Sequence, residues 1–99
     1  MAVIYHITTL QEWKDAQQKG FYAASSLAQE GFIHNSEAHQ VAGVLERYYK
    51  NQKDLVQLCI DTRKLMHPLK YEYAPSVQDT FPHIYGPLNL DAVIDVQYL

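Results

Sequence analysis

The sequence predicts an α+β fold, in which a compact split sheet of antiparallel or mixed strands packs against two main helices. About five or six short segments have strand-like character, whereas two longer segments carry a helical apolar period. Strands and helices do not alternate strictly and no internal repeat is present, so helices segregated against one sheet are favoured over a doubly wound parallel sheet. We expect one domain, 1–99, because most domains have roughly 50–200 residues.

Composition and charge restrict the class of protein. Hydrophobic residues make up 47% of the chain and aromatic residues 12%, which is enough for a core without disulfides, and Cys59 is the single cysteine. A net charge of −3 and a pI near 5.9 argue against binding to a nucleic-acid backbone. No apolar run approaches ~18 residues and the N-terminus lacks a signal-peptide pattern, so we expect a cytoplasmic protein without a membrane partner.

The first predicted strand, Val3–Thr8, leads directly into a helix. Its β-branched and aromatic residues are typical of a strand. Thr9 and Glu12 have the spacing of a capping box, and Gly20 is suited to end the helix after Lys19.

Short elements are expected to follow. Phe21–Ala24 reads as extended, Ser26–Gln29 repeats the capping pattern and predicts one helical turn ended by Gly31, and Phe32–His34 reads as a brief strand. The second main helix comes next, with Asn35 or Ser36 as its expected cap. Its apolar residues follow the spacing i, i+3, i+4 and i+7 and form one face: Val41, Val44, Leu45 and Tyr48.

Three strands are predicted in the second half of the chain. Leu55–Ile60 is nearly all apolar, which indicates a central strand buried on both faces. After a turn capped by Asp61 and ended by Pro68, Leu69–Tyr73 alternates as a strand. Ala92–Leu99 closes the chain, and its expected inward residues are Ile94, Val96 and Tyr98.

A stiff, non-helical loop is predicted over Phe81–Leu90, after a surface loop over Ala74–Thr80. The two prolines of Phe81–Leu90 fix their own φ near ~−65° and bias the residues before them towards extended geometry. Such a loop would hold the rings of His83 and Tyr85 at fixed angles, either to bind a ligand or to close the end of a small sheet.

Three of the five histidines are candidate site residues. His6, His34 and His83 lie in or beside extended segments, at predicted strand ends where sites form, whereas His39 and His67 are expected to be solvated. Packing of these three rings in the core is the alternative.

Two other chemistries stay open at this point. His6, His34 and His83 could bind zinc from separate strands, although no pair has the short H-x-x-H spacing. Ser26, Ser36 or Cys59 could act as a nucleophile beside a histidine, but helix capping explains the serines and burial explains the cysteine.

Glu72 is the candidate acid. It lies between Tyr71 and Tyr73 in a predicted strand, on the opposite face. That face is either a cleft or an outward surface that Glu72 shares with Lys70.

The chain resembles, along nearly its whole length, the domain-of-unknown-function 952 family. The matching blocks are Tyr5–Thr8, Trp13 and Ala16 before Gly20, Ser26–Leu27, Glu30–Ser36, Gln40–Val41, Ile60–Asp61, Tyr71–Glu72 and Phe81–Leu88. The block Phe-Pro-His-Ile-Tyr-Gly-Pro-Leu is the most specific. Asn35 departs from the family pattern, which has a small residue there, often cysteine; this departure would change selectivity if the position contacts a ligand.

The resemblance implies an ADP-ribosyltransferase-like fold that holds NAD in a cleft. In such folds a histidine or arginine on the first strand contacts the adenosine-side ribose, an aromatic ring stacks on nicotinamide, and a late acid stabilises an oxocarbenium-like transition state. His6 matches the first-strand position and Glu72 is the candidate for the late acid. His34, His83 and Tyr85 have no counterpart in the transferases.

Two hypotheses of function follow. The first is a cleft that binds NAD or a related nucleotide and transfers ADP-ribose. Its candidate catalytic residues are His34, His83 and Glu72, and its candidate binding residues are His6, Ser26, Ser36 and Tyr85. The second is a non-catalytic module that binds a small molecule or a protein through the same pocket. The enzyme hypothesis requires the imidazoles of the three histidines to converge on one pocket, with a carboxylate within reach.

Overall fold

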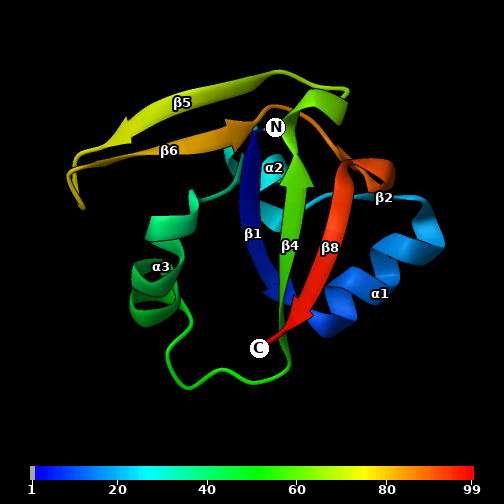
Figure 1. Ribbon diagram of the computed structural model, residues 1–99, viewed down its shortest axis with the longest axis horizontal. Helices are drawn as coiled ribbons and strands as arrows, with labels where there is room; N and C mark the ends of the chain where they lie inside the picture. The colour runs from blue at the N-terminus through cyan, green and yellow to red at the C-terminus, as the bar shows by residue number, and fades with distance from the viewer. Residues whose placement is uncertain (1) are drawn as a thin grey trace.

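A three-stranded antiparallel sheet in the order β1-β4-β8 forms the centre of the computed structural model, which describes residues 2–99 (Figure 1). Its strands are β1 (Val3–Thr9), β4 (Leu55–Asp61) and β8 (Val93–Tyr98). The prediction of an apolar central strand is confirmed, because β4 lies between the other two and Val56, Leu58 and Ile60 are fully buried.

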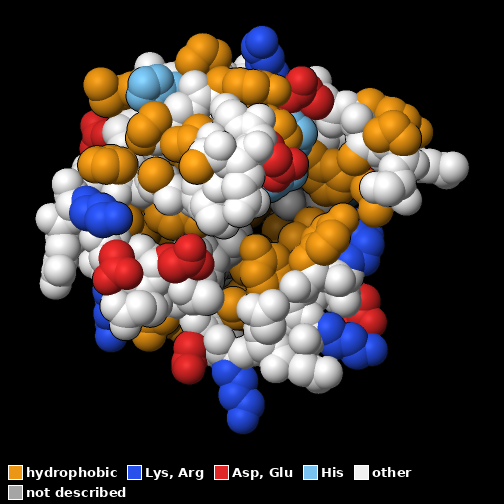
Figure 2. All heavy atoms as spheres, turned by 180° about the vertical axis from the view of Figure 1, so that it is seen from behind, with side chains coloured by type: hydrophobic (Ala, Val, Ile, Leu, Met, Phe, Trp, Pro, Cys, Tyr) orange, Lys and Arg blue, Asp and Glu red, His pale blue; other side chains and the backbone are white. Residues whose placement is uncertain are grey.

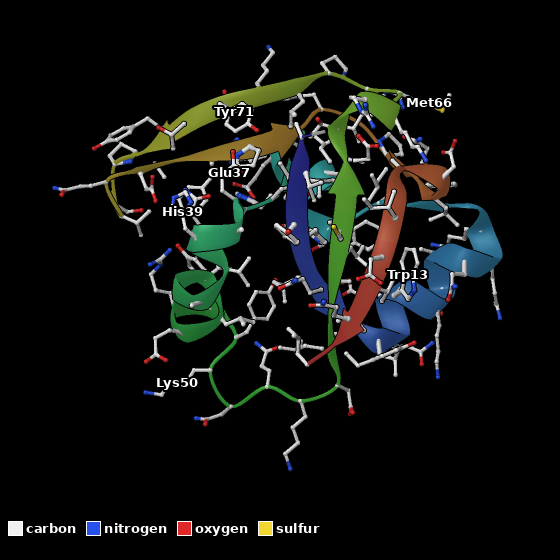
Figure 3. The ribbon with its side chains drawn as sticks, in the orientation of Figure 1. Trp13, Glu37, His39, Lys50, Met66 and Tyr71 are labelled. Atoms are coloured by element: carbon white, nitrogen blue, oxygen red, sulfur yellow. The ribbon has the colours of Figure 1, made fainter. Side chains whose placement is uncertain are left out.

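Helix α1 (Leu10–Lys19) covers one side of this sheet, and both of its predicted ends are confirmed. The Thr9 hydroxyl accepts a hydrogen bond from the Glu12 amide at 3.1 Å. Gly20 ends the helix in the left-handed conformation, with φ of 91°. Trp13 and Ala16 are buried, and Trp13 points from α1 towards the sheet (Figure 3).

A second sheet, in the order β3-β6-β5, lies across one end of the first (Figure 1). It consists of β3 (Ile33–His34), β5 (Leu69–Ala74) and β6 (Asp79–Ile84), all antiparallel. The predicted loops over Ala74–Thr80 and Phe81–Leu90 are therefore wrong in part, since β5 and β6 form a hairpin.

The loop was predicted because proline fixes its own φ and biases the residue before it, whereas Pro82 lies in β6, the middle strand of the second sheet, where proline is rare. The carbonyl of Pro82 accepts the Asn35 amide at 3.0 Å, so its nitrogen also faces the β3 side. The β3 ladder ends at the pair His34–His83, one residue before Pro82 would have to donate a hydrogen bond. The short length of β3 is what makes a proline acceptable in β6.

The remaining short elements close the fold. Strands β2 (Phe21–Tyr22) and β7 (Leu88–Asn89) form a two-stranded sheet, and helix α2 (Ser25–Glu30) ends at Gly31 as predicted. Ser26 does not cap α2. The helix begins after Ala24, and the Ser26 hydroxyl donates to the Phe32 carbonyl at 2.8 Å. Two 3₁₀ turns, η2 (Thr62–Lys64) and η3 (Leu90–Ala92), flank the later strands, and Asp61 caps η2 as predicted.

Helix α3 (Val41–Tyr48) starts later than predicted, after the 3₁₀ turn η1 (Ala38–Gln40). Neither Asn35 nor Ser36 is the cap, because Glu37 and Gln40 form a reciprocal capping box at the start of η1. Glu37 lies beneath Tyr71 of β5 (Figure 3). Burial and this carboxylate together raise the pKa of the Tyr71 phenol.

The predicted inward face of the last strand is wrong at Ile94 and Tyr98. The register of β8 against β4 shifts, since Cys59 pairs with Asp95 but Ile60 pairs with Val93. This bulge leaves Ile94 unpaired and 41% exposed. Tyr98 lies at the end of the strand and is 71% exposed.

Two backbone hydrogen bonds join the two larger sheets. The Tyr5 amide donates to the Ser36 carbonyl at 2.8 Å, and the Ser36 amide donates to the Tyr5 carbonyl at 2.7 Å. Because Ser36 follows β3, the pair attaches the second sheet to the edge of β1. The split-sheet architecture predicted from the sequence is thus observed, with every pairing antiparallel rather than mixed.

The core lies between the first sheet, α1 and the short β2–β7 sheet. Its fully buried members are Ile4, Ile33, Val56, Leu58, Ile60, Ile84, Leu88 and Ala92. His39 and His67 are exposed, as predicted. Within residues 2–99 no helix has the length and apolar character needed to cross a membrane.

We expect Leu58→Ala to lower the free energy of unfolding by about 2–5 kcal/mol, because it leaves a cavity at a fully buried position of the central strand. Leu99→Ala is the control, since Leu99 is 54% exposed and its loss should change stability by less than about 0.5 kcal/mol. Urea denaturation of both variants measures the difference. Equal stabilities would contradict the placement of the core.

Candidate functional site

A cleft of about 470 Å³ is formed by β1, the segment around β3, α3 and the β5–β6 hairpin. This volume is within the roughly 300–1,000 Å³ of small-molecule sites. Figure 2 views the molecule from the side opposite to Figure 1 and shows a hollow near the middle of that face, bordered by hydrophobic side chains.

The lining of the cleft is aromatic and aliphatic, with a few polar groups. Its aromatic residues are Tyr5, Phe32, Tyr48, Tyr49 and Phe81, and its aliphatic residues are Ile7, Val44, Ala74 and Val77. Its polar residues are His6, His34, Asn35, Ser36, Ser76 and His83. Among the residues that the structure describes, no Lys, Arg, Asp or Glu lines the cleft.

The three candidate histidines meet at this cleft, as the enzyme hypothesis requires. The ring centroids of His34 and His83 are 5.2 Å apart, and Phe32 stacks on His83 with centroids 4.0 Å apart. The His6 side chain reaches the same region, because its Nδ1 lies 2.5 Å from the His34 carbonyl oxygen. Residues from β1, β3 and β6 therefore converge although they are far apart in sequence.

Glu72 lies outside the cleft and orients His83 through a hydrogen bond. The Oε1 atom of Glu72 accepts hydrogen bonds from the Tyr85 hydroxyl and from His83 Nδ1, the latter at 2.8 Å. The hydrogen bonds from Tyr85 and then from His83 lower the pKa of Glu72, so its carboxylate is ionised at neutral pH. This bond places the proton of neutral His83 on Nδ1, and Nε2, which has no hydrogen-bond partner among residues 2–99, is left as an acceptor.

A second histidine–carboxylate pair lies beside the first. His34 Nε2 is 2.8 Å from Glu30 Oε2, four residues earlier in the chain. The side chains of this pair are 52% and 47% exposed, whereas the His83 side chain is 11% exposed. Water therefore screens the His34 pair more strongly than the His83 pair.

His6 is held neutral in the wall of the cleft. Burial lowers the pKa of His6 from 6.5 to about 4, against the opposing effect of its bond to the His34 carbonyl. Because a carbonyl only accepts, Nδ1 carries the proton, and Nε2 accepts from the Tyr22 hydroxyl at 2.8 Å.

The chain of contacts continues from Tyr22 to the protein surface. The Tyr22 hydroxyl is 3.1 Å from Thr8 Oγ1, which donates to Glu12 Oε1 at 2.8 Å. From the His34 carbonyl to Glu12 there are four contacts, but neutral His6, Tyr22 and Thr8 supply only three protons. The Tyr22 hydroxyl can therefore donate to only one of His6 and Thr8 at a time. Glu12 and Tyr22 also line a second, smaller pocket of about 150 Å³.

Of the other candidate residues named from the sequence, some line the cleft and others lie outside it. Ser36 lines the cleft, whereas Ser26, Glu72 and Tyr85 do not. Ser26 is bonded to the Phe32 carbonyl, and Glu72 and Tyr85 reach the site only through His83 and through the contact of Tyr85 with Phe32.

Sequence reasoning did not single out the aromatic wall, and it noted Asn35 only as a departure from the family pattern that would matter if the position contacts a ligand. The apolar face of α3 was the available signal: it is not buried in the core, and Val44 and Tyr48 line the cleft. Helical periodicity locates an apolar face but does not distinguish core from cleft.

The structure disfavours both a zinc site formed by the three histidines and Cys59 as a nucleophile. Within the described residues no group of three or more His, Cys, Asp or Glu side chains could hold a metal ion. Both ring nitrogens of His6 already make hydrogen bonds. Burial raises the pKa of the Cys59 thiol, which disfavours the thiolate form, and Cys59 is not among the cleft residues.

Comparison with known proteins assigns the family. Residues 7–96 match the family described as "Protein of unknown function (DUF952)". The chain belongs to this family. The resemblance inferred from the sequence blocks is confirmed, while its ADP-ribosyltransferase-like part stays a prediction.

Solved structures of the protein CC0527 from Caulobacter crescentus have the same fold. Its crystal structure has a TM-score of 0.88 and 29% identity, and the comparison covers 97% of this chain and 84% of that one. The solution NMR structure has a TM-score of 0.84 and 30% identity, with 100% and 85% covered. No protein with a curated description matches this DUF952 chain.

We expect His6 to remain a neutral Nδ1–H imidazole down to about pH 5, because its pKa is lowered to about 4. In the unfolded chain His6 binds a proton near pH 6.5, whereas in the folded chain it does so only near pH 4. The contribution of His6 to the free energy of unfolding is therefore complete above pH 6.5 and is lost as the pH falls to about 4. The total loss is about 3 kcal/mol. Long-range ¹H–¹⁵N spectra of the histidine rings measure the tautomer directly. A His6 titration near pH 6.5 would contradict burial in this network.

We expect Glu72→Gln to increase the Nε2–H tautomer of His83, because a glutamine amide can donate to Nδ1 as well as accept from it. The same ring spectra at neutral pH measure the tautomer ratio. Glu30→Gln is the matched control, since it alters only the partner of His34. An unchanged His83 tautomer in Glu72→Gln would show that the carboxylate does not orient this ring.

Proposed function

We propose that the cleft binds a small molecule with a planar aromatic ring, NAD or a related nucleotide being the first candidate, and that His83 acts there as a general base. The observation that carries this proposal is the His83–Glu72 pair beside an aromatic-lined cleft. A histidine with Nδ1–H bonded to a carboxylate presents Nε2 as a proton acceptor, the arrangement used in general base catalysis.

The proposed reaction is transfer of ADP-ribose from NAD to an acceptor hydroxyl. The acceptor oxygen forms a bond to the anomeric carbon of the ribose while its proton passes to His83 Nε2. The glycosidic C–N bond breaks, and its electron pair leaves with neutral nicotinamide. In this scheme Glu72 is a positioning residue for His83 rather than an acid in contact with the ribose, because it does not line the cleft.

The other proposed residues have supporting roles. His34 stands beside His83 at the more exposed part of the site and could contact the acceptor, while His6 and Ser36 shape the wall beneath. Tyr85 supports Glu72 through its hydroxyl. Ser26 supports the segment before β3 through the Phe32 carbonyl.

A non-catalytic binding module is the second candidate. One observation favours it: within residues 2–99 no carboxylate lines the cleft, and a carboxylate is the group that would stabilise an oxocarbenium-like transition state. Binding of a ligand without release of nicotinamide from NAD is the result that separates this module from the transferase.

We expect NAD at about a hundred times its dissociation constant to stabilise the protein by roughly 2.7 kcal/mol. For a domain of this size the melting temperature should rise by on the order of 10 °C. His83→Ala should remove most of the shift, while His67→Ala, an exposed histidine outside the cleft, should keep it.

Two outcomes decide between the candidates. A shift that is lost in His83→Ala, together with nicotinamide release, supports the transferase, and a shift without release supports the module. His34→Ala replaces His83→Ala if the latter does not fold, because His34 is exposed. No shift at millimolar NAD would remove NAD as the ligand.

A further inference from the structure

The side chain of Asn35 has a buried acceptor without a partner. Asn35 is 3% exposed and lines the cleft. Its Nδ2 donates to the Ile33 carbonyl at 2.9 Å and lies 3.5 Å from the Pro82 carbonyl. Turning the amide over would set Oδ1 against these two carbonyls, so the orientation is fixed. Within the described chain Oδ1 is a buried polar side-chain atom that makes no hydrogen bond.

A buried acceptor of this kind calls for an explanation, since nearly all such groups in folded proteins are paired. Leaving it unpaired in a closed site is costly, and a donor from a ligand or a water removes that cost. Because Asn35 belongs to the cleft wall, a group bound in the cleft is a candidate source of such a donor.

The two neighbouring histidines present acceptors as well. His83 donates through Nδ1 to Glu72, and His34 donates through Nε2 to Glu30. In each neutral ring the second nitrogen therefore holds a lone pair, and among residues 2–99 neither nitrogen has a hydrogen-bond partner. The cleft thus offers acceptors from three side chains.

The charges around the cleft also argue against an anionic ligand. Its lining contains no Lys or Arg among the described residues, so a carboxylate or a pyrophosphate inside it would lose water without gaining a counter-charge. Lys70 stands over the Tyr85 ring, with Nζ 4.9 Å from the centroid, and is not part of the lining.

From these observations we infer that the cleft selects an aromatic group that has no negative charge and carries an N–H or O–H donor, such as an aromatic amide or amine, and that Asn35 Oδ1 is the specificity-determining acceptor. The inference rests on the proposed function and refines it. If the ligand is a nucleotide, its base or its carboxamide ring enters the cleft and its phosphates stay outside the lined cavity.

Three probes of similar size separate charge from hydrogen bonding. Benzamide is neutral and has an N–H donor, methyl benzoate is neutral without a donor, and benzoate is an anion. We expect benzamide to bind more tightly than either of the others, on the order of tenfold. Amide chemical shifts of the labelled full chain, titrated with each probe, give the three dissociation constants.

Asn35 variants test the named residue. Asn35→Leu removes the acceptor, and we expect the preference for benzamide over methyl benzoate to disappear. The melting temperature and the amide spectrum of each variant establish that it is folded. If Asn35→Leu does not fold, Asn35→Ala, which also removes the acceptor, takes its place, and the same loss of preference is expected.

The possible failures are distinguishable. If none of the three probes shifts the cleft residues, the proposed aromatic small-molecule site is wrong. If benzoate or methyl benzoate binds as tightly as benzamide, or if Asn35→Leu keeps the wild-type preference, the site stands and the inference on ligand class is overturned.

Discussion

The backbone pairing between Tyr5 and Ser36 is the constraint on which the cleft depends. It fastens the second sheet to the edge of β1 through two short hydrogen bonds. His6 adds a third bond across the same junction, to the carbonyl of His34. Because main-chain atoms make most of this junction, its geometry does not rely on any ligand being bound. A site formed in advance in this way spares a ligand part of the entropy cost of ordering the protein.

The site contains two histidine–glutamate pairs that differ in their exposure to solvent. A glutamate fixes the tautomer of His83 from the neighbouring strand, and another glutamate fixes that of His34 from the preceding helix. The pair on the hairpin is the more sheltered, since the His83 side chain is 11% exposed. Electrostatic control of a ring is stronger where water is excluded. Under the proposed function the His83 pair is therefore the chemical centre, and the more exposed His34 is accessible to molecules at the surface.

Local signals in the sequence were sufficient for much of the fold. Thr9, Glu12 and Gly20 determine both ends of α1 through bonds to adjacent backbone, and the apolar run of β4 requires burial on both faces. The errors arose where distant contacts decide the local structure. Pro82 is accepted in β6 only because β3 is short, and Ile94 is exposed only because β8 shifts its register.

The site was predictable to a similar extent. His6, His34 and His83 could be selected because each lies in or beside a segment with strand-like sequence, although His6 lies in the middle of β1 rather than at its end. Their tautomers could not, since they depend on partners that tertiary structure supplies, such as the Tyr22 hydroxyl and the Glu72 carboxylate. The unpaired Oδ1 of Asn35 could not be predicted either, because only the folded structure shows that Nδ2 of the same amide faces the Ile33 and Pro82 carbonyls.

The bulge in β8 also bears on how copies of the protein meet in concentrated solution. In the sheet order of the described chain β8 is an outer strand, and such strands can template pairing with another molecule. The register shift interrupts the regular spacing of its hydrogen-bonding groups at Ile94, and Asp95 adds a charge at the next position. Natural proteins use both features to discourage edge-to-edge aggregation. The residue that breaks the inward pattern of the last strand thus helps to keep the central sheet at three strands.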